Sequence, residues 1–211
     1  MPRLDGIDVS HWDGTVDWSA VRGAESIQLV AAKATEGTGD RDPQFAANWA
    51  GMRAAGFRVR IAYHFATGDP PEEQAAWFAA TIADAGGPLL AGEGVMVDIE
   101  PSPPLVGELP VAHLAELLAA IESSTGRTPL RYMGEYYPGA GDPALDRFPL
   151  WLPDYTMNGA RPTTQLAHAI WQWGGGEDGA FVPGIGAGST HVDSDEVEDW
   201  PTVERLVQLV R

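Results

Sequence analysis

The fold is decided by the stretch Gly94-Val95-Met96-Val97-Asp98-Ile99-Glu100-Pro101, an apolar run that ends in two acids. The run predicts a buried strand, and the proline ends it because proline cannot extend the hydrogen-bonded ladder. Side chains alternate along a strand, so Asp98 and Glu100 share one face, about 6–7 Å apart along the backbone. Acids this close do not ionise independently, and one can hold a proton near neutral pH while its neighbour is charged. This pattern indicates acid/base chemistry on a glycoside.

Strand and helix signals alternate on both sides of this stretch. Strands are predicted over residues 4–10, 27–34, 57–65 and 95–100, and helices over 18–22, 42–55, 71–85 and 110–124. Four short strands follow with little between them, over 130–133, 150–152, 169–173 and 191–193, before a last helix over 200–210. Alternation of this kind favours a parallel sheet. Because a full (β/α) barrel usually takes about 250 residues, the 211 residues predict a trimmed TIM-like barrel in a single domain over 1–211.

Composition excludes several classes of function. The formal net charge of −17 argues against nucleic acid and anionic membranes as partners, since both are bound through Lys and Arg. No apolar run is long enough to predict a membrane span. There is no cysteine, which excludes a disulfide framework and a thiolate nucleophile. Residues 1–6 lack the basic and apolar regions of a signal peptide, so none is expected there. A neutral glycan suits this chain better than a charged polymer.

In a barrel of this kind the active site lies at the carboxyl ends of the strands. The residues predicted there are Asp8, Lys33, Glu36, Tyr63, His64, Asp98, Glu100, Trp151 and Asp193. Several carboxylates at one mouth repel one another, and Lys33, the sole lysine, is the expected counter-charge. Trp12, Trp151 and Trp173 are placed where a sugar ring could stack.

Each of these residues also has a plainer interpretation. Asp8 could hydrogen-bond the turn that follows it, and Lys33 with Glu36 could be a solvated pair of little energetic weight. His64 is more typical of a satisfied hydrogen-bonding residue than of a metal ligand, because no second histidine lies at ligand spacing. The tryptophans belong to the core by default. It is the joint placement of these residues at strand ends that favours a site.

Ordered motifs in the chain resemble those of glycoside hydrolase family 25, the Chalaropsis-type lysozymes or N-acetylmuramidases, which include phage endolysins. The motifs are Gly6-Ile7-Asp8-Val9-Ser10, Lys33-Ala34-Thr35-Glu36-Gly37, Ala62-Tyr63-His64-Phe65 and Val97-Asp98-Ile99-Glu100, with Asp42-Pro43-Gln44-Phe45, Asn48-Trp49, Trp171-Gln172 and Val192-Asp193 as further matches. The resemblance runs from residue 4 to about residue 196. It implies a (β/α)5(β)3 barrel that cleaves the β-1,4 bond between N-acetylmuramic acid and N-acetylglucosamine.

The resemblance also implies roles for individual residues. Glu100 would protonate the leaving oxygen, Asp98 would assist at the reacting acetamido group or the oxocarbenium-like centre, and Asp8 and Asp193 would be supporting acids. Between Asp193 and Asp195, the match to a Val-Asp motif favours Asp193 as the inward residue. The substrate-binding residues expected on this basis are Lys33, Glu36, Tyr63, His64, Trp12, Tyr132, Trp151, Gln172 and Trp173. No metal and no organic cofactor are implied.

Other interpretations stay open at this point. A chitinase-like glycosidase would carry further aspartates before the Asp-x-Glu, where this chain has Glu93 and Met96. A glycan-binding protein on the same barrel would be free to lose the acids that this chain keeps. The order of attack, by water or by the substrate's own acetamido group, depends on carboxylate separation, which sequence does not give. We expect a monomer that acts on bacterial peptidoglycan at the cell wall.

Overall fold

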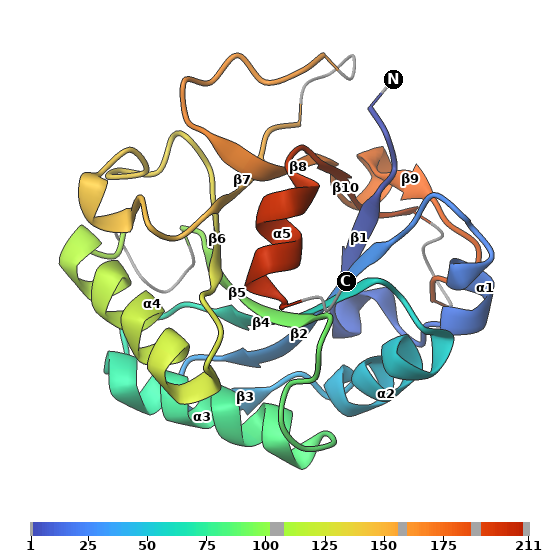
Figure 1. Cartoon of the computed structure of the whole chain (residues 1–211), viewed down its shortest axis with the longest axis horizontal. Coiled ribbons are helices and arrows are strands. Elements are labelled where there is room, and N and C mark those ends of the chain that lie inside the picture. Colours follow the sequence, from blue (N-terminus) through green and yellow to red (C-terminus); the bar gives the residue numbers. More distant parts are fainter. Residues whose placement is uncertain (1, 102–107, 156–159, 187–190, 209–211) are drawn as a thin grey trace.

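The computed structural model describes residues 2–101, 108–155, 160–186 and 191–208, and it confirms the predicted barrel (Figure 1). Eight strands close the ring, in the spatial order β1 (Gly6–Val9), β2 (Leu29–Glu36), β4 (Val59–Phe65), β5 (Glu93–Ile99), β6 (Leu130–Met133), β7 (Leu150–Pro153), β8 (His168–Gly174) and β10 (His191–Val197). Closure is made where β10 pairs with β1. Two short strands, β3 (Asp40–Arg41) and β9 (Ala180–Phe181), attach to β2 and β10.

The direction of β10 differs from that of the other barrel strands. Neighbouring strands from β1 to β8 run parallel, whereas β10 is antiparallel to both β1 and β8. The first residues of β10 therefore lie at the same end of the barrel as the last residues of the parallel strands. This end is called the mouth below, because parallel barrels place their sites at the carboxyl ends of strands.

Helices cover only part of the outside of the barrel. The helices α1 (Trp18–Arg22), α2 (Phe45–Ala55), α3 (Pro71–Asp84) and α4 (Val111–Thr125) follow β1, β2, β4 and β5 in turn (Figure 1). After β6 the described chain has the short 3-10 helix η2 (Pro143–Leu145) where a full barrel has an α-helix. The predicted loss of helices in the second half is therefore confirmed. Apolar side chains between helices and strands form the larger of two cores.

The second core fills the barrel itself and is closed at one end by α5 (Trp200–Leu206). Val203 and Val207 pack against Leu29 and Val59, which lie at the amino-terminal ends of their strands. Figure 1 shows α5 across the centre of the ring. The prediction extended this helix to residue 210, but it ends at Leu206, and residues 209–211 lie outside the described chain. The end of the barrel opposite the mouth is thus plugged.

The start of α2 also differs from its prediction. Residues Asp42-Pro43 were expected to open the helix, but it begins at Phe45. The Asp42 carboxylate accepts hydrogen bonds from the Gln44 amide at 2.8 Å and from the His11 amide at 2.8 Å. Asp42 therefore ties the chain after β1 to the segment before α2. The predicted stop at Gly56 is confirmed, with the left-handed conformation (φ 70°) that glycine adopts at low cost.

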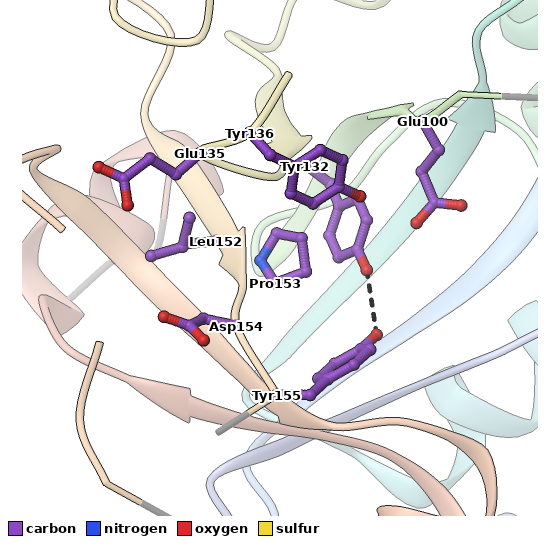
Figure 2. A pocket seen from close by; sticks show the side chains of 8 residues that line it. All are labelled: Glu100, Tyr132, Glu135, Tyr136, Leu152, Pro153, Asp154 and Tyr155. Atoms are coloured by element: carbon purple, nitrogen blue, oxygen red, sulfur yellow. Dashed lines mark hydrogen bonds between the residues drawn. The ribbon is translucent and has the colours of Figure 1, made fainter. Parts of the chain in front are cut away.

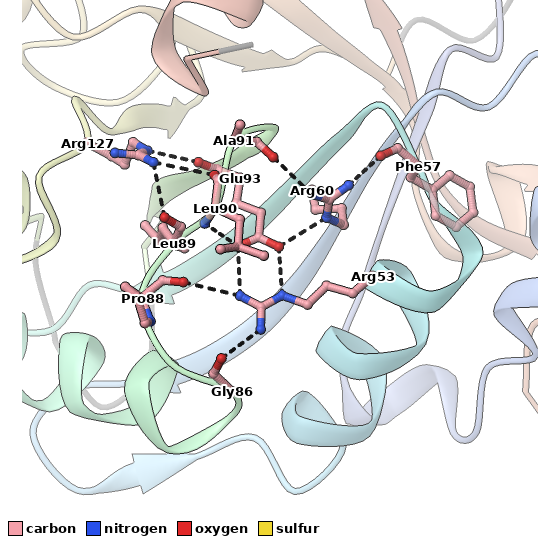
Figure 3. Close-up of polar contacts among 10 residues, drawn as sticks. All are labelled: Arg53, Phe57, Arg60, Gly86, Pro88, Leu89, Leu90, Ala91, Glu93 and Arg127. Atoms are coloured by element: carbon pink, nitrogen blue, oxygen red, sulfur yellow. Dashed lines mark hydrogen bonds and ion pairs between the residues drawn. The ribbon is translucent and has the colours of Figure 1, made fainter. Parts of the chain in front are cut away.

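A buried ionic cluster fastens the amino-terminal end of β5 (Figure 3). Glu93 has no exposed surface, and its carboxylate accepts both Arg53 Nε at 2.7 Å and Arg53 Nη2 at 2.8 Å. Arg60 Nε donates to the same carboxylate at 3.2 Å, and the Leu90 amide donates to it at 2.8 Å. Burial pushes the pKa of Glu93 up, but these donors and charges more than offset it, and its pKa lies below the ordinary value. Glu93 is thus held as an anion.

Candidate active site

The acids predicted from the sequence converge on the mouth. Asp98 lies one residue before the end of β5, and Glu100 follows that strand directly. Asp8 in β1 pairs in register with Asp193 in β10, which places their β-carbons about 4.5–5.5 Å apart. Each of these carboxyls acts electrostatically on at least one of the others across the mouth. The four acids therefore form a single group, drawn from three strands.

Asp98 and Glu100 are both half-buried. Burial is the main cause that raises the pKa of Asp98 well above its ordinary value, and the neighbouring Glu100 adds to the effect. Burial also raises the pKa of Glu100, against the nearby Tyr132 hydroxyl and the charge of Lys33, which lower it. Burial, and not a neighbouring charge, is the first cause of the raised pKa of Glu100. A carboxyl whose pKa is raised in this way is suited to act as a general acid.

Asp8 lies deeper, at 7% exposure. Its Oδ2 atom accepts a hydrogen bond from Gln172 Nε2 at 2.6 Å. Burial raises the pKa of Asp8 well above its ordinary value, Asp193 and Asp195 raise it further, and the bond from Gln172 opposes them. Asp8 is therefore held in one orientation by an amide, with no cation beside it among the described residues.

Both candidate acids of β10 point into the barrel, so Asp193 is inward as predicted and Asp195 shares its face. Residues two apart on a strand share a face, and Asp195 lies one step deeper, opposite Gly6. Trp151 Nε1 donates to Asp195 Oδ1 at 2.9 Å, while its Oδ2 is buried without a hydrogen-bond partner in the described protein. Asp193 is nearer the surface, and its Oδ1 accepts the Gly176 amide at 2.8 Å. Burial raises the pKa of Asp193 to about 6.

A pocket of about 510 Å³ opens beside Glu100. Figure 2 shows its lining residues, which are Glu100, Tyr132, Glu135, Tyr136, Leu152, Pro153, Asp154 and Tyr155. At its floor Tyr132 Oη donates to Gln172 Oε1 at 2.6 Å and lies 3.3 Å from Tyr155 Oη. Tyr155 also donates to Gln172 Oε1. Since Gln172 in turn donates to Asp8, a continuous chain of hydrogen bonds joins the pocket to the acids.

Two residues of this hydrogen-bond network, Gln172 and Tyr155, differ from the sequence-based prediction. Gln172 was predicted to bind substrate, but it is 1% exposed and its amide already bonds Asp8, Tyr132 and Tyr155. Gln172 therefore orients these three neighbours and is not itself accessible to substrate. Tyr155 was not predicted at all, because it follows β7 in a segment without strand periodicity. Its only sequence signal is an aromatic residue just past a strand end.

Lys33 is the basic residue nearest the acids. Its Nζ donates to Glu36 Oε2 at 2.8 Å and lies 4.6 Å from the centre of the Phe65 ring. Its charge lowers the pKa of both Asp98 and Glu100, as the sequence-based expectation of a counter-charge requires. Glu36 is the more exposed partner of the pair, at 39% of its side chain. Lys33 and Glu36 therefore stand at the mouth as predicted.

Tyr63 also reaches the acids. It is 7% exposed, and burial followed by the charges of Asp8 and Asp98 raises its pKa well above the ordinary value. Its hydroxyl therefore stays protonated. Among the described residues no group of three or more His, Asp or Glu side chains is arranged to hold a metal ion. What the mouth offers is proton transfer by carboxyl groups within a tyrosine-lined wall.

A sequence model of one enzyme family matches the chain. The model, described as glycosyl hydrolases family 25, covers residues 7–180. The chain belongs to glycoside hydrolase family 25. The resemblance drawn from the motifs is thereby confirmed, and this family 25 protein is a glycoside hydrolase.

Two curated relatives are much longer than the matched region. Lysozyme M1 from Streptomyces globisporus is 48% identical over 63 residues, which are 30% of this chain and 21% of that protein. The uncharacterized protein YegX from Escherichia coli (strain K12) is 30% identical over 176 residues, 80% of this chain and 62% of that protein. The family 25 chain thus spans less than two thirds of each of these relatives.

Solved structures share the barrel. The bacterial lysozyme from Streptomyces coelicolor superposes with a TM-score of 0.73 at 24% identity, covering 96% of this chain and 95% of that one. The muramidase from Trichobolus zukalii gives 0.75 at 24% identity, with 96% and 98% covered. The catalytic domain of endolysin ply40 from a Listeria monocytogenes bacteriophage gives 0.73 at 19% identity, with 98% of each covered. In the described part of the family 25 chain, no helix has the length and apolarity needed to cross a membrane.

Three predicted substrate-binding residues do not line the mouth of this family 25 enzyme. His64 is fully buried outside the barrel wall, where its Nδ1 lies 2.8 Å from Thr35 Oγ1 and its Nε2 lies 3.0 Å from Gln74 Oε1. Burial lowers its pKa to about 4, so it stays neutral. The plainer interpretation of His64, a satisfied histidine in the packing between β4 and α3, is the one that the structure supports.

The predictions for Trp151 in β7 and Trp173 in β8 are corrected for different reasons. Trp151 does point into the barrel, but it has no exposed surface and lies one layer below the mouth, bonded to Asp195. Trp173 adjoins the inward-facing Gln172 and so points outward. Its Nε1 donates to the Arg3 carbonyl at 3.0 Å, on the outer surface. Neither ring is available to stack on a sugar in the mouth.

Trp12 keeps its predicted accessibility. It lies in the 3-10 helix η1 (His11–Asp13), directly after β1, and it is 85% exposed. Its ring packs on His11 with centroids 4.4 Å apart. An exposed tryptophan at the edge of the mouth is placed to meet a substrate that extends beyond the acids.

Proposed function

We propose that this enzyme hydrolyses bacterial peptidoglycan at the β-1,4 bond between N-acetylmuramic acid and N-acetylglucosamine. The single observation that carries the proposal is the place of Glu100, a carboxyl with raised pKa on the wall of a pocket and next to the deeper Asp98. Family membership supports the substrate class, since solved relatives are described as lysozymes and muramidases.

In this proposal Glu100 gives its proton to the leaving glycosidic oxygen. A general acid must be protonated before the reaction and able to lose its proton during it, and the opposing effects of burial and Lys33 on the pKa of Glu100 fit that requirement. Asp98, deeper in the same wall, would stabilise positive charge at the sugar carbon or orient the acetamido group. Its buried Oδ1, without a protein partner among the described residues, is suited to accept such a group.

Asp8 and Asp193 are supporting acids in this scheme. In its ionised form, either acid would favour an oxocarbenium-like centre. Gln172 holds Asp8, and the Gly176 amide holds Asp193. Lys33 limits the total repulsion. Each supporting acid is therefore held by a hydrogen bond from a neighbouring group.

The test is Glu100→Gln, a change that keeps the size of the side chain and removes its acid. We expect cleavage of purified peptidoglycan to fall about 10²- to 10⁴-fold, the usual weight of a general acid. Thermal unfolding should stay close to wild type. Glu25→Gln is the matched control, since it removes an exposed carboxylate that precedes β2, at the end of the barrel opposite the mouth. Wild-type cleavage by the Glu100 variant would contradict the assignment.

The bond is identified from the fragments that the wild-type enzyme releases. Borohydride reduction followed by mass spectrometry marks the sugar at each new reducing end. Muramic acid there supports the muramidase proposal, whereas glucosamine means that the other glycosidic bond is cut. No release from any wall, with binding retained, would favour a glycan-binding protein. Hydrolysis of chitin oligosaccharides in preference to peptidoglycan would favour the chitinase-like alternative.

A further inference from the structure

Outside the pocket beside Glu100, the described rim of the mouth carries two further large aromatic side chains in solvent, and the proposed mechanism gives neither of them a role in the chemistry. Trp12 is 85% exposed and Phe181 is 63% exposed. Phe181 lies in β9, beside β10, and Trp12 follows β1. Both therefore belong to the side of the barrel where β10 closes against β1. Exposure of rings this large costs hydration free energy, so a pair of them at one rim calls for an occupant.

The register of β9 fixes the direction of Phe181. It pairs with His191, and the two rings meet edge-on with centroids 6.1 Å apart. His191 shares its face of β10 with Asp193, two residues along the strand. Phe181 and His191 therefore stand on the inward face, about 7 Å farther out than Asp193. The wall that carries the acid continues outward as an aromatic surface.

Short hydrogen bonds hold this aromatic surface in place. The Ala180 amide donates to Ser194 Oγ at 2.8 Å, and His191 Nδ1 donates to the Gly179 carbonyl at 2.8 Å. Phe181 is thus anchored at the residue before it and at the residue that it pairs with. A ring that is already positioned loses little entropy when a ligand stacks on it.

The Trp12 side of the rim is fastened as firmly. His11, on which Trp12 packs, bonds Asp42 through both its amide and Nδ1, at 2.8 and 2.9 Å. The two halves of the rim are joined by a β-bridge between Val16 and Ile185. Trp12 and Phe181 are therefore parts of one supported edge.

We propose that Trp12 and Phe181 form an accessory stacking platform for sugar units of the glycan strand that extend past the β1–β10 edge of the mouth. This inference rests on the proposed function and extends it, because it states that the enzyme binds sugar units beyond those next to the cleaved bond. Pyranose faces carry C–H groups that pack on aromatic rings, and the imidazoles of His11 and His191 are placed to meet hydroxyl groups.

The positions of the pocket and the platform support binding of a glycan strand across the mouth. The pocket beside Glu100 is lined from the ends of β5, β6 and β7, whereas the platform stands at β1 and β10. A strand that crosses the acids therefore meets the pocket on one side and the platform on the other. Cleavage of long strands should profit from the platform, while fragments too short to reach it should not.

The test compares Phe181→Ala and Trp12→Ala on peptide-free glycan strands separated by length. Each variant should raise KM for long strands about two- to tenfold, the weight of one aromatic contact, with kcat nearly unchanged. For the shortest strands that are cleaved, the change in KM should be clearly smaller. Phe181→Tyr, which keeps the ring, should retain the wild-type KM. Leu90→Ala is the control, because Leu90 is 53% exposed at the opposite end of the barrel.

Equal effects on short and long strands, or no effect on long ones, would overturn the platform. Binding of long strands to Glu100→Gln, with and without Phe181→Ala, gives a readout that does not need cleavage. If the wild type binds strands through Phe181 but cleaves none, the proposed function fails and the platform stands. If cleavage is normal and binding ignores both rings, the platform fails alone.

Discussion

At its amino-terminal end β5 presents Glu93 to two arginines, whereas at its carboxyl-terminal end Asp98 and Glu100 share the field of one lysine. Glu93 is completely buried and receives four hydrogen bonds, so its pKa is lowered. Asp98 is half-buried, and its Oδ1 is buried without a hydrogen-bond partner in the described protein, so its pKa is raised. The neighbours account for the opposite directions of the two pKa shifts, since arginines and donors surround Glu93 whereas another acid lies beside Asp98.

The two ends therefore do different work. A buried carboxylate with matched donors fastens segments together, and here it joins β5 to the carboxyl end of α2 and to the turn before the strand. A buried carboxyl with too few donors has a raised pKa, which does not stabilise the fold but suits acid/base catalysis. The ion pairs of Glu93 should thus stabilise the fold, whereas the acids at the mouth should destabilise it. Three changes test that division.

The largest effect is expected for Glu93→Gln, which removes the charge and leaves Arg53 and Arg60 without an anion. Breaking a buried ion pair from one side costs about 3 kcal/mol or more of the free energy of unfolding. Urea unfolding at pH 7 measures it. Because the folded pKa of Glu93 is lowered, its contribution is lost as pH falls, and the variant and wild type should converge in acid. An unchanged midpoint at pH 7 would show that the cluster does not fasten β5.

The next effect has the opposite sign. Asp193→Asn should stabilise the protein near pH 7, on the order of 2 kcal/mol, while it lowers activity. The folded pKa of Asp193 is about 6, above that of an unfolded aspartate, so the native state binds the proton more tightly. Stability is therefore lost as pH rises through the window from about 4 to 6. The gain from Asn should be complete above this window and vanish below it, as unfolding at pH 3.5 and 7 would reveal.

The smallest effect is expected for Lys33→Met, which removes the cation that lowers the pKa of both Asp98 and Glu100. Both limbs of the pH profile of kcat/KM should move to higher pH, with a change of no more than about tenfold at the optimum. Lys33→Arg keeps the charge and should keep the profile. A profile that is unmoved in Lys33→Met would mean that the mouth is tuned by burial alone.

The sequence predicted those parts of the site that follow from strand alternation. Asp98 and Glu100 share a face because they lie two residues apart, and Asp8 ends a parallel strand, so all three reach the mouth. The same rule could have placed Asp195 inside with Asp193. The motif match chose between two residues that alternation allows to point the same way. Alternation also places either Gln172 or Trp173 inward but never both, and Gln172 is the inward one.

Other errors came from depth, which no local pattern encodes. Trp151 faces inward as expected, yet it lies below the mouth because Asp195 from another strand holds its indole. His64 is a different case, since it follows the inward-facing Tyr63 and alternation alone places it towards the helices. Tyr155 lies in an irregular segment, and only the folded chain brings its hydroxyl to Gln172. Contacts with strands distant in sequence therefore decide which inward-facing residues can touch substrate and which are buried beneath the mouth.

The plug formed by α5 has a practical consequence for surface immobilisation. Val203 of this helix and Val207, the residue just after the helix, pack in the core inside the barrel at the end opposite the acids. A linker joined after this helix would leave the molecule on the side away from the mouth. An enzyme coupled to a bead or a sensor chip through that linker would present its mouth to the suspension, where whole cell walls, too large to diffuse into a matrix, could reach it.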